Sequence, residues 1–180
     1  MKDQDIKNKL KIIAIRYVMI ILIGSIAAFS SLLYKILLPL TIYPANFLLS
    51  LFFSSEVIGG TILVGNSIIE LIPACIAVSA YLLLFILNMT APMGIKKRVY
   101  SLLFSFALLL LINILRITFF SILVVNDSQL FESLHLLAWY LFSIIFVVGI
   151  WFLTIQIFKI KSLPVYDDLK FVLKSLYRKP

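Results

Sequence analysis

Long apolar runs, separated by short stretches that carry most of the charge, constrain this chain more than any other feature. The clearest run, LLLLINILRITFFSILV over residues 108–124, holds one charged residue. A helix that crosses a bilayer needs about 20 predominantly apolar residues, which this run nearly fills by itself. Because 63% of the 180 residues are hydrophobic and 13% are charged, the composition excludes an ordinary soluble domain. The sequence therefore predicts a polytopic membrane protein.

The length of the chain leaves room for about four such spans and short loops, which makes one compact all-α membrane domain over residues 1–180. The first predicted span is too long for a signal peptide and lacks a small-residue cleavage site. Residues 161–180 form a predicted basic tail. The four predicted spans cover residues 17–40, 73–89, 99–125 and 134–158.

The segment between the first two predicted spans has two parts. Residues 41–55 are apolar but short, with Pro44 near their start, so we expect them to lie in the membrane interface or to dip into it. In residues 56–72, β-branched side chains flank Gly65 and Asn66, a pair that favours a tight turn. We therefore expect a short extracytoplasmic β-hairpin before the second span.

The lysine and arginine residues are distributed unequally between the two sides of the predicted spans. Residues 41–72 and 126–133 contain none, whereas the other flanks, including Lys96-Lys97-Arg98, hold nearly all of them. By the positive-inside rule, both termini are cytoplasmic, and Lys35 is a single exception that can extend to the interface. The net charge of +8 thus suits anionic lipid headgroups, and we expect no nucleic acid partner.

Cys75 is the only cysteine, so an internal disulfide, a CxxC pair and a thiolate zinc cluster are excluded. We expect no metal and no other cofactor. The predicted topology places Cys75 in the first turn of the second span, at the outer interface, after Pro73 at the first helical position. A helix N-terminus favours the thiolate, the nucleophilic form of the side chain. The alternatives are a buried, inert thiol and a lipidated cysteine.

Arg116 lies inside an otherwise apolar span, where insertion scales give a cost of about 2.5 kcal/mol or more. At 1.5 Å per residue it is about 14 Å from the outer end of that span. Asn113 is three residues earlier on the same helical face and is a supporting residue for the same interior site. Alternatively, Arg116 extends to the interface or locks helices together through their carbonyl groups.

His135, the only histidine, follows Ser133, which we expect to be the N-cap of the fourth span at its outer end. Alone it is equally consistent with an ordinary interfacial histidine. Together, however, Cys75, Arg116 and His135 come from three spans and project from the same side of the membrane. This set suits thiol acyl transfer: a thiolate attacks a carbonyl, an imidazole moves the proton, and a cation stabilises developing negative charge.

Two other residues near this set were given no catalytic role. Glu70 is close to the cysteine in sequence but is expected to face solvent on the hairpin. Ser79 as the nucleophile of a serine hydrolase ranks last, because the chain lacks a supporting acid and an elbow motif.

The segments PACIAVSAYLLLFILNMT, NILRI and HLLAWY resemble the exosortase and archaeosortase family of membrane cysteine transpeptidases, most closely small archaeal members of the pacearchaeosortase type. The resemblance covers residues 57–170, with a catalytic core at about 57–160. It implies an enzyme that cleaves surface proteins at a C-terminal signal and transfers them to an acceptor. Cys75 matches the family nucleophile, and Arg116 and His135 match its partners. Ala77 stands where many members have glycine, and the chain is much shorter than the bacterial exosortases.

The resemblance also implies partners: substrates with a short C-terminal motif, a transmembrane helix and a basic tail, and a lipid or amine acceptor within the cell membrane. A different class remains open from the residues alone. A non-catalytic membrane subunit or small transporter would use Arg116 to bind an anionic headgroup or solute. The two classes differ at Cys75, which only the enzyme requires.

Overall fold

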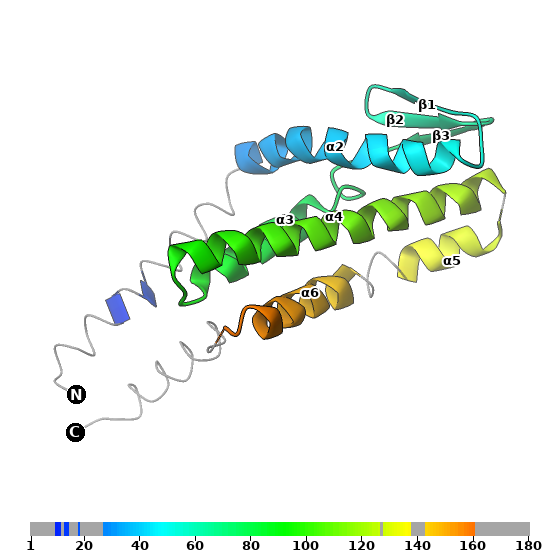
Figure 1. Cartoon of the computed structure of the whole chain (residues 1–180). Coiled ribbons are helices and arrows are strands. Elements are labelled where there is room, and N and C mark those ends of the chain that lie inside the picture. The colour runs from blue at the N-terminus through cyan, green and yellow to red at the C-terminus, as the bar shows by residue number, and fades with distance from the viewer. Residues whose placement is uncertain are drawn as a thin grey trace, which may run out of the picture.

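The computed structural model describes residues 27–126, 128–137 and 143–160, together with residues 10, 11, 13, 14 and 18. Long helices dominate this part of the chain, and a small sheet lies at one end of them (Figure 1). Part of the first predicted span and the predicted tail over residues 161–180 lie outside the described residues. The elements are α2 (Ala27–Ser50), β1 (Ser55–Ile58), β2 (Thr61–Val64), β3 (Ser67–Glu70), α3 (Val78–Thr90), α4 (Ile95–Val125), α5 (Leu130–Leu137) and α6 (Ser143–Ile157).

Helix α4 is the central element, and α2, α3, α5 and α6 all contact it. It is long and apolar enough to cross a membrane, and it begins four residues before the expected start of the third span at residue 99. Its buried positions recur every fourth residue, so they form one stripe along the helix. Small or polar side chains occupy most of this stripe, which lets neighbouring helices approach closely. The stripe consists of Ser101, Ser105, Leu109, Asn113, Ile117 and Ser121.

Hydrogen bonds between side chains join α4 to α3 and α6. Ser101 Oγ donates to Asn88 Oδ1 at 3.0 Å, and the hydroxyl oxygens of Ser105 and Thr154 are 2.9 Å apart. Such bonds hold apolar helices together where burial of apolar surface gives little preference for one arrangement. Contacts of this kind fix the antiparallel packing of α4 against both neighbours.

Helix α2 corrects the expectation for residues 41–55. The chain does not leave the helix near Leu40; α2 continues through Pro39 and Pro44 to Ser50. A proline removes one backbone donor, but the helix persists because its buried residues keep a helical spacing and pack against α3, α4 and the sheet. The buried positions are Leu37, Thr41, Ile42, Ala45 and Leu49. Only residues 51–54 connect this helix to the first strand.

The predicted hairpin is present as part of a larger sheet. Strands β2 and β3 are antiparallel and meet at a two-residue turn of Gly65 and Asn66, where Gly65 has a φ of 57°. The third strand, β1, pairs with β2 through a second turn at Gly59 and Gly60, so the strand order is β1-β2-β3. This second turn was not predicted from the sequence; its first residue, Gly59, also has a positive φ, of 63°. Helix α2 contacts β1 and β2, while α4 contacts β3.

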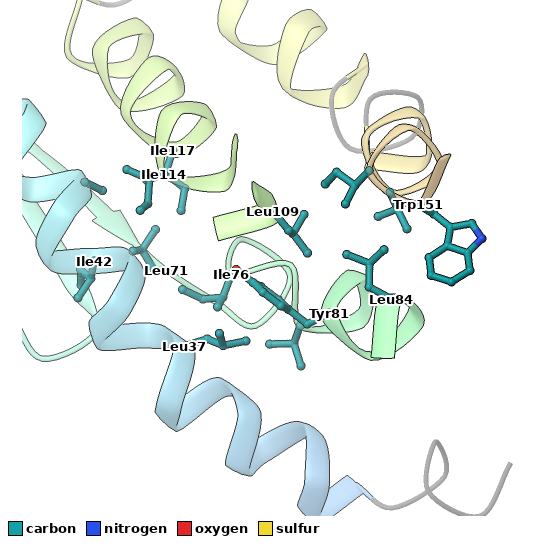
Figure 2. Packing of buried hydrophobic residues seen from close by; sticks show 14 of the residues in the cluster. Leu37, Ile42, Leu71, Ile76, Tyr81, Leu84, Leu109, Ile114, Ile117 and Trp151 are labelled. Atoms are coloured by element: carbon teal, nitrogen blue, oxygen red, sulfur yellow. The ribbon is translucent and has the colours of Figure 1, made fainter. Parts of the chain in front are cut away.

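The hydrophobic core lies where the chain passes from β3 to α3. Side chains of α2, α3, α4 and α6 gather around this connection, and Ile76 and Tyr81 point into their midst (Figure 2). Tyr34 Oη, on α2, donates a hydrogen bond of 2.8 Å to the carbonyl oxygen of Leu71 at the start of the connection. The connection is therefore held from both sides before it reaches Cys75.

Two helices in the described residues are long and apolar enough to cross a membrane: Ser31–Ser50 within α2, and Ile95–Val125. Helices α3 and α6 are also apolar but have 13 and 15 residues. At 1.5 Å per residue, 13 helical residues extend about 20 Å, less than the roughly 30 Å hydrocarbon core. The second predicted span is thus shorter as a regular helix than the sequence indicated, because α3 begins at residue 78 rather than 73.

Candidate functional site

A cavity of about 380 Å³ lies between β3, α4 and α5. It brings together Cys75, Arg116 and His135, the three residues singled out from the sequence. Apolar side chains make up most of the wall, as in typical ligand pockets, and a few polar groups interrupt it. The remaining wall consists of Ile68, Ile69, Glu70, Leu71, Ile117, Phe120, Ser121, Val124 and Phe131.

Cys75 lies in a hydrogen-bonded turn before α3, not in the first turn of that helix. Its N–H donates to the carbonyl of Ile72 at 2.9 Å, and the N–H of Val78 donates back to Pro73 at 3.3 Å. The expectation that Pro73 begins a helix is therefore wrong. Cys75 lies three residues before the first residue of α3, and the turn uses the N–H of Cys75 itself, so the expected helix N-terminus does not lie at the thiol.

Ala77 separates this turn from the helix. Its backbone has φ 60° and ψ 36°, in the left-handed region that costs a residue with a Cβ about 1–2 kcal/mol. An alanine in the sequence does not indicate a left-handed backbone, so only the structure reveals this conformation. The position is the one where the resembling family often has glycine, which adopts positive φ without that cost.

Two side chains of α4 hold the backbone of Cys75. Arg116 Nη2 donates a hydrogen bond of 2.9 Å to the carbonyl oxygen of Cys75, and Asn113 Nδ2 donates to the same oxygen at 3.0 Å. Arg116 and Asn113 are one turn apart on α4, as the sequence indicated. Both residues thus position the thiol, and Arg116 in addition lines the cavity that the thiol faces.

Arg116 also borders a second cavity of about 160 Å³, between α3, α4 and α6. Asn113, Ser79 and Phe146 line this second space, and Cys75 does not. Ser79 therefore faces a different cavity from the thiol. The guanidinium stands between the two cavities, so it can act on a group bound in either of them.

His135 lies on α5, which begins at Leu130, four residues before the expected start of the fourth span at residue 134. Ser133 is inside α5 and is not its N-cap; Ser128 Oγ instead accepts a hydrogen bond from the N–H of Leu130 at 3.4 Å. Residues 138–142, in the middle of the predicted span, are outside the described residues.

Two aromatic rings fix the orientation of the His135 ring. Phe131, one turn earlier on α5, stacks on it with a centroid distance of 5.2 Å and an interplanar angle of 13°. Phe120, from α4, meets it edge to face at 5.4 Å and 85°. These contacts restrict the imidazole on two sides and connect α5 to the helix that carries Arg116.

Two polar residues of the cavity wall were not assigned to the site from the sequence. Glu70, which was expected to face solvent, is exposed but also lines the cavity. Ser121 is 2% exposed, and its hydroxyl has no hydrogen-bond partner among the described residues. The only sequence signal for Ser121 is its position in the buried stripe of α4, which includes every fourth residue.

The cavity holds the groups that thiol chemistry on a carbonyl needs: a sulfur nucleophile, an imidazole and a guanidinium. Within the described residues, no group of three or more histidine, cysteine, aspartate or glutamate side chains could hold a metal ion. Comparisons with protein-family models, with curated proteins and with solved structures find no match for this chain.

Proposed function

We propose that the protein is a membrane-embedded thiol peptidase and transpeptidase of the exosortase and archaeosortase type. The observation that carries this proposal is the single cavity shared by Cys75, Arg116 and His135, which come from three separate elements. Their roles are nucleophile, stabiliser of the oxyanion and carrier of the proton. Asn113 is a positioning residue, because its amide holds the carbonyl of Cys75.

In the proposed reaction, His135 takes the proton of the Cys75 thiol, and the sulfur attacks the carbonyl carbon of the scissile peptide bond. The new C–S bond forms a tetrahedral oxyanion next to Arg116. The C–N bond then breaks, and the leaving amine takes its proton from His135. An acceptor hydroxyl or amine attacks the resulting thioester, transfers its proton to His135 and releases the thiolate of Cys75. Water in place of the acceptor would give hydrolysis instead.

The proposed substrates are surface proteins with a C-terminal motif, a transmembrane helix and a basic tail. A substrate with its own membrane helix presents the motif at the membrane surface, where this cavity lies next to the sheet. The proposed acceptor is a lipid. These identities come from the family resemblance in the sequence, while the cavity supports the reaction type.

The proposed topology has four spans, cytoplasmic termini and an active site on the extracytoplasmic side of the cell membrane. Basic groups and the cavity are at opposite ends of α4, which supports this orientation. Lys97 Nζ, in the first turn of α4, donates to the carbonyl of Lys159 at 3.1 Å. The C-terminal part of α4, which includes Arg116, lies toward the sheet and α5 (Figure 1).

The test replaces Cys75 with alanine and with serine in cells that make the full-length protein. Both variants should remain in the membrane at wild-type abundance, and proteins with the C-terminal signal should accumulate uncleaved. Immunoblots of a tagged signal-bearing protein and of the enzyme measure both quantities. Full cleavage in cells with the alanine variant would contradict the proposal.

A second candidate is a non-catalytic protein that binds an anionic headgroup or solute. The observation in its favour is the second cavity, which Arg116 borders away from the thiol. This function would survive Cys75→Ala, which abolishes the proposed enzyme activity, so that variant separates the two candidates.

A further inference from the structure

We propose that the free edge of β3 binds the extended segment of the substrate that precedes the scissile bond, as an added fourth strand. This inference rests on the proposed function, because it names how the substrate reaches Cys75. The edge strand and the cysteine border the same cavity, and backbone groups of β3 rather than its side chains make the proposed contacts.

The register of β2 and β3 decides which backbone groups of β3 are engaged. Ser67 pairs with Val64 across a two-residue turn, so these residues form a hydrogen-bonded pair. Hydrogen-bonded pairs alternate with non-bonded pairs in an antiparallel ladder, which makes Ile69 the next bonded residue of β3. The N–H of Leu71 donates to Gly60 at 3.0 Å and continues this alternation.

It follows that Ile68 and Glu70 direct their N–H and C=O groups away from β2, toward the outer edge of the sheet. Both residues line the cavity that holds Cys75, and Ile68 is 74% exposed. Five positions separate Glu70 from Cys75, so an added strand would end close to the thiol. The outer edge of β3 is thus both unpaired by β2 and open to the site.

The opposite edge of the sheet differs. Strand β1 packs against α2, and Ser55 Oγ donates to the carbonyl of Asn46 on that helix at 3.4 Å. Exposed strand edges are templates for an added chain, and their main-chain bonds accept many sequences while side-chain pockets give specificity. An extended peptide is the occupant because only a backbone with alternating donors and acceptors matches Ile68 and Glu70. A lipid chain would leave these groups without partners.

The test uses a reagent whose chemistry does not depend on the natural substrate. Tetrapeptidyl chloromethyl ketones, made as a mixture with varied side chains, carry an extended backbone before the reactive carbon. The sulfur of Cys75 displaces chloride and forms a thioether, and the thiol proton is released. Acetyl-glycyl chloromethyl ketone has the same reactive group without the peptide. Mass spectrometry of the full-length protein in detergent gives the rate constant for modification of Cys75.

The peptide reagents should modify Cys75 about tenfold faster than acetyl-glycyl chloromethyl ketone, since each backbone hydrogen bond gives about three- to tenfold. N-methylation tests the direction of the bonds. One reagent carries methyl groups on the odd-numbered peptide nitrogens, and a second carries them on the even-numbered ones. Only one of the two reagents should lose the gain in rate, because only every second N–H faces a neighbouring strand. An equal loss of rate with both methylated reagents, or no gain in rate from the peptide, would overturn the inference.

Ile68→Pro removes the outward N–H and leaves the bonds to β2, a position where a strand tolerates proline. In this variant the gain in rate from the peptide should be about three- to tenfold smaller than in the wild type. Ile68→Ala is the matched control, because it shortens the side chain and keeps the N–H; an equal loss in both variants would contradict a backbone role. If acetyl-glycyl chloromethyl ketone fails to modify Cys75 at all, the proposed function fails. A reactive Cys75 without any peptide gain would refute only the fourth strand.

Discussion

Arg116 donates a hydrogen bond of 2.9 Å to the carbonyl oxygen of Cys75, 41 positions earlier in the sequence. The bond connects the candidate nucleophile to the longest helix of the described residues. A guanidinium has five N–H donors in a planar fork, so it can hold a backbone carbonyl and still present donors to a second group. Variants of Arg116 should therefore change both the position of the thiol and the stability of a bound oxyanion.

Replacement of Arg116 by lysine separates these effects from simple charge. Lysine keeps the positive charge but has no planar fork, so we expect turnover to fall by about 10²–10³ while the protein remains in the membrane. The measurement compares the rate of signal cleavage and the membrane abundance of Arg116→Lys and Arg116→Ala. Near-normal cleavage by the lysine variant would remove Arg116 from the catalytic set. Loss of both variants from the membrane would show a structural role.

Asn113→Leu removes the second donor to the Cys75 carbonyl and leaves the bond from Arg116 in place. We expect the free energy of unfolding to fall by about 1 kcal/mol, the usual net contribution of one hydrogen bond. Cleavage should fall less than in Arg116→Lys. The control is Leu111→Ala on an exposed position of the same helix, which should change stability by less than about 0.5 kcal/mol. Unfolding in detergent provides the comparison; equal stability of the Asn113 variant and wild type would contradict the contact.

Ala77→Gly should stabilise the protein, which is unusual for a glycine substitution. The left-handed backbone costs alanine about 1–2 kcal/mol, and the extra freedom of glycine in the unfolded chain offsets about 0.5–1 kcal/mol of the gain. The matched control, Ala107→Gly in the exposed middle of α4, should instead lower stability by about 1 kcal/mol. Opposite signs in thermal unfolding are the expected result. A loss of stability at both positions would show that Ala77 is not left-handed.

Helix α4 and the turn at Gly65 and Asn66 could be predicted from the sequence, because both have strong local signals. A continuous apolar run defines the helix, and the Gly-Asn pair selects a tight turn. The sequence did not predict the extent of α2, where Pro44 indicated a break. Packing of the buried face against α3, α4 and the sheet outweighed that local preference.

The site likewise has one part that the sequence predicted and another that it did not. Unique residues in three apolar segments, and the charge asymmetry, predicted that Cys75, Arg116 and His135 lie together. The turn around Cys75 could not be predicted, because it depends on a left-handed alanine and on donors 38 and 41 positions away. The start of α5 at Leu130 was also missed, since Ser133 was expected to be the N-cap.

The proposed orientation predicts opposite accessibility of the two ends of α4. In a Cys75→Ser background, single cysteines replace Glu56 on β1 and Ile95 at the start of α4, both of which are exposed. A membrane-impermeant maleimide added to intact cells should label the cysteine at 56. The cysteine at 95 should react only after permeabilisation. The reverse pattern would overturn the orientation, and labelling of both in intact cells would exclude a membrane barrier between them.

The central claim is that Cys75 forms a covalent thioester with the chain it cleaves. The most direct measurement is mass spectrometry of the peptide that contains Cys75, on protein purified rapidly from cells that make a signal-bearing substrate. We predict an acyl adduct on Cys75 that hydroxylamine removes and that is absent from Cys75→Ala. Efficient cleavage of the substrate by Cys75→Ala, with no adduct on the wild-type cysteine, would contradict the account.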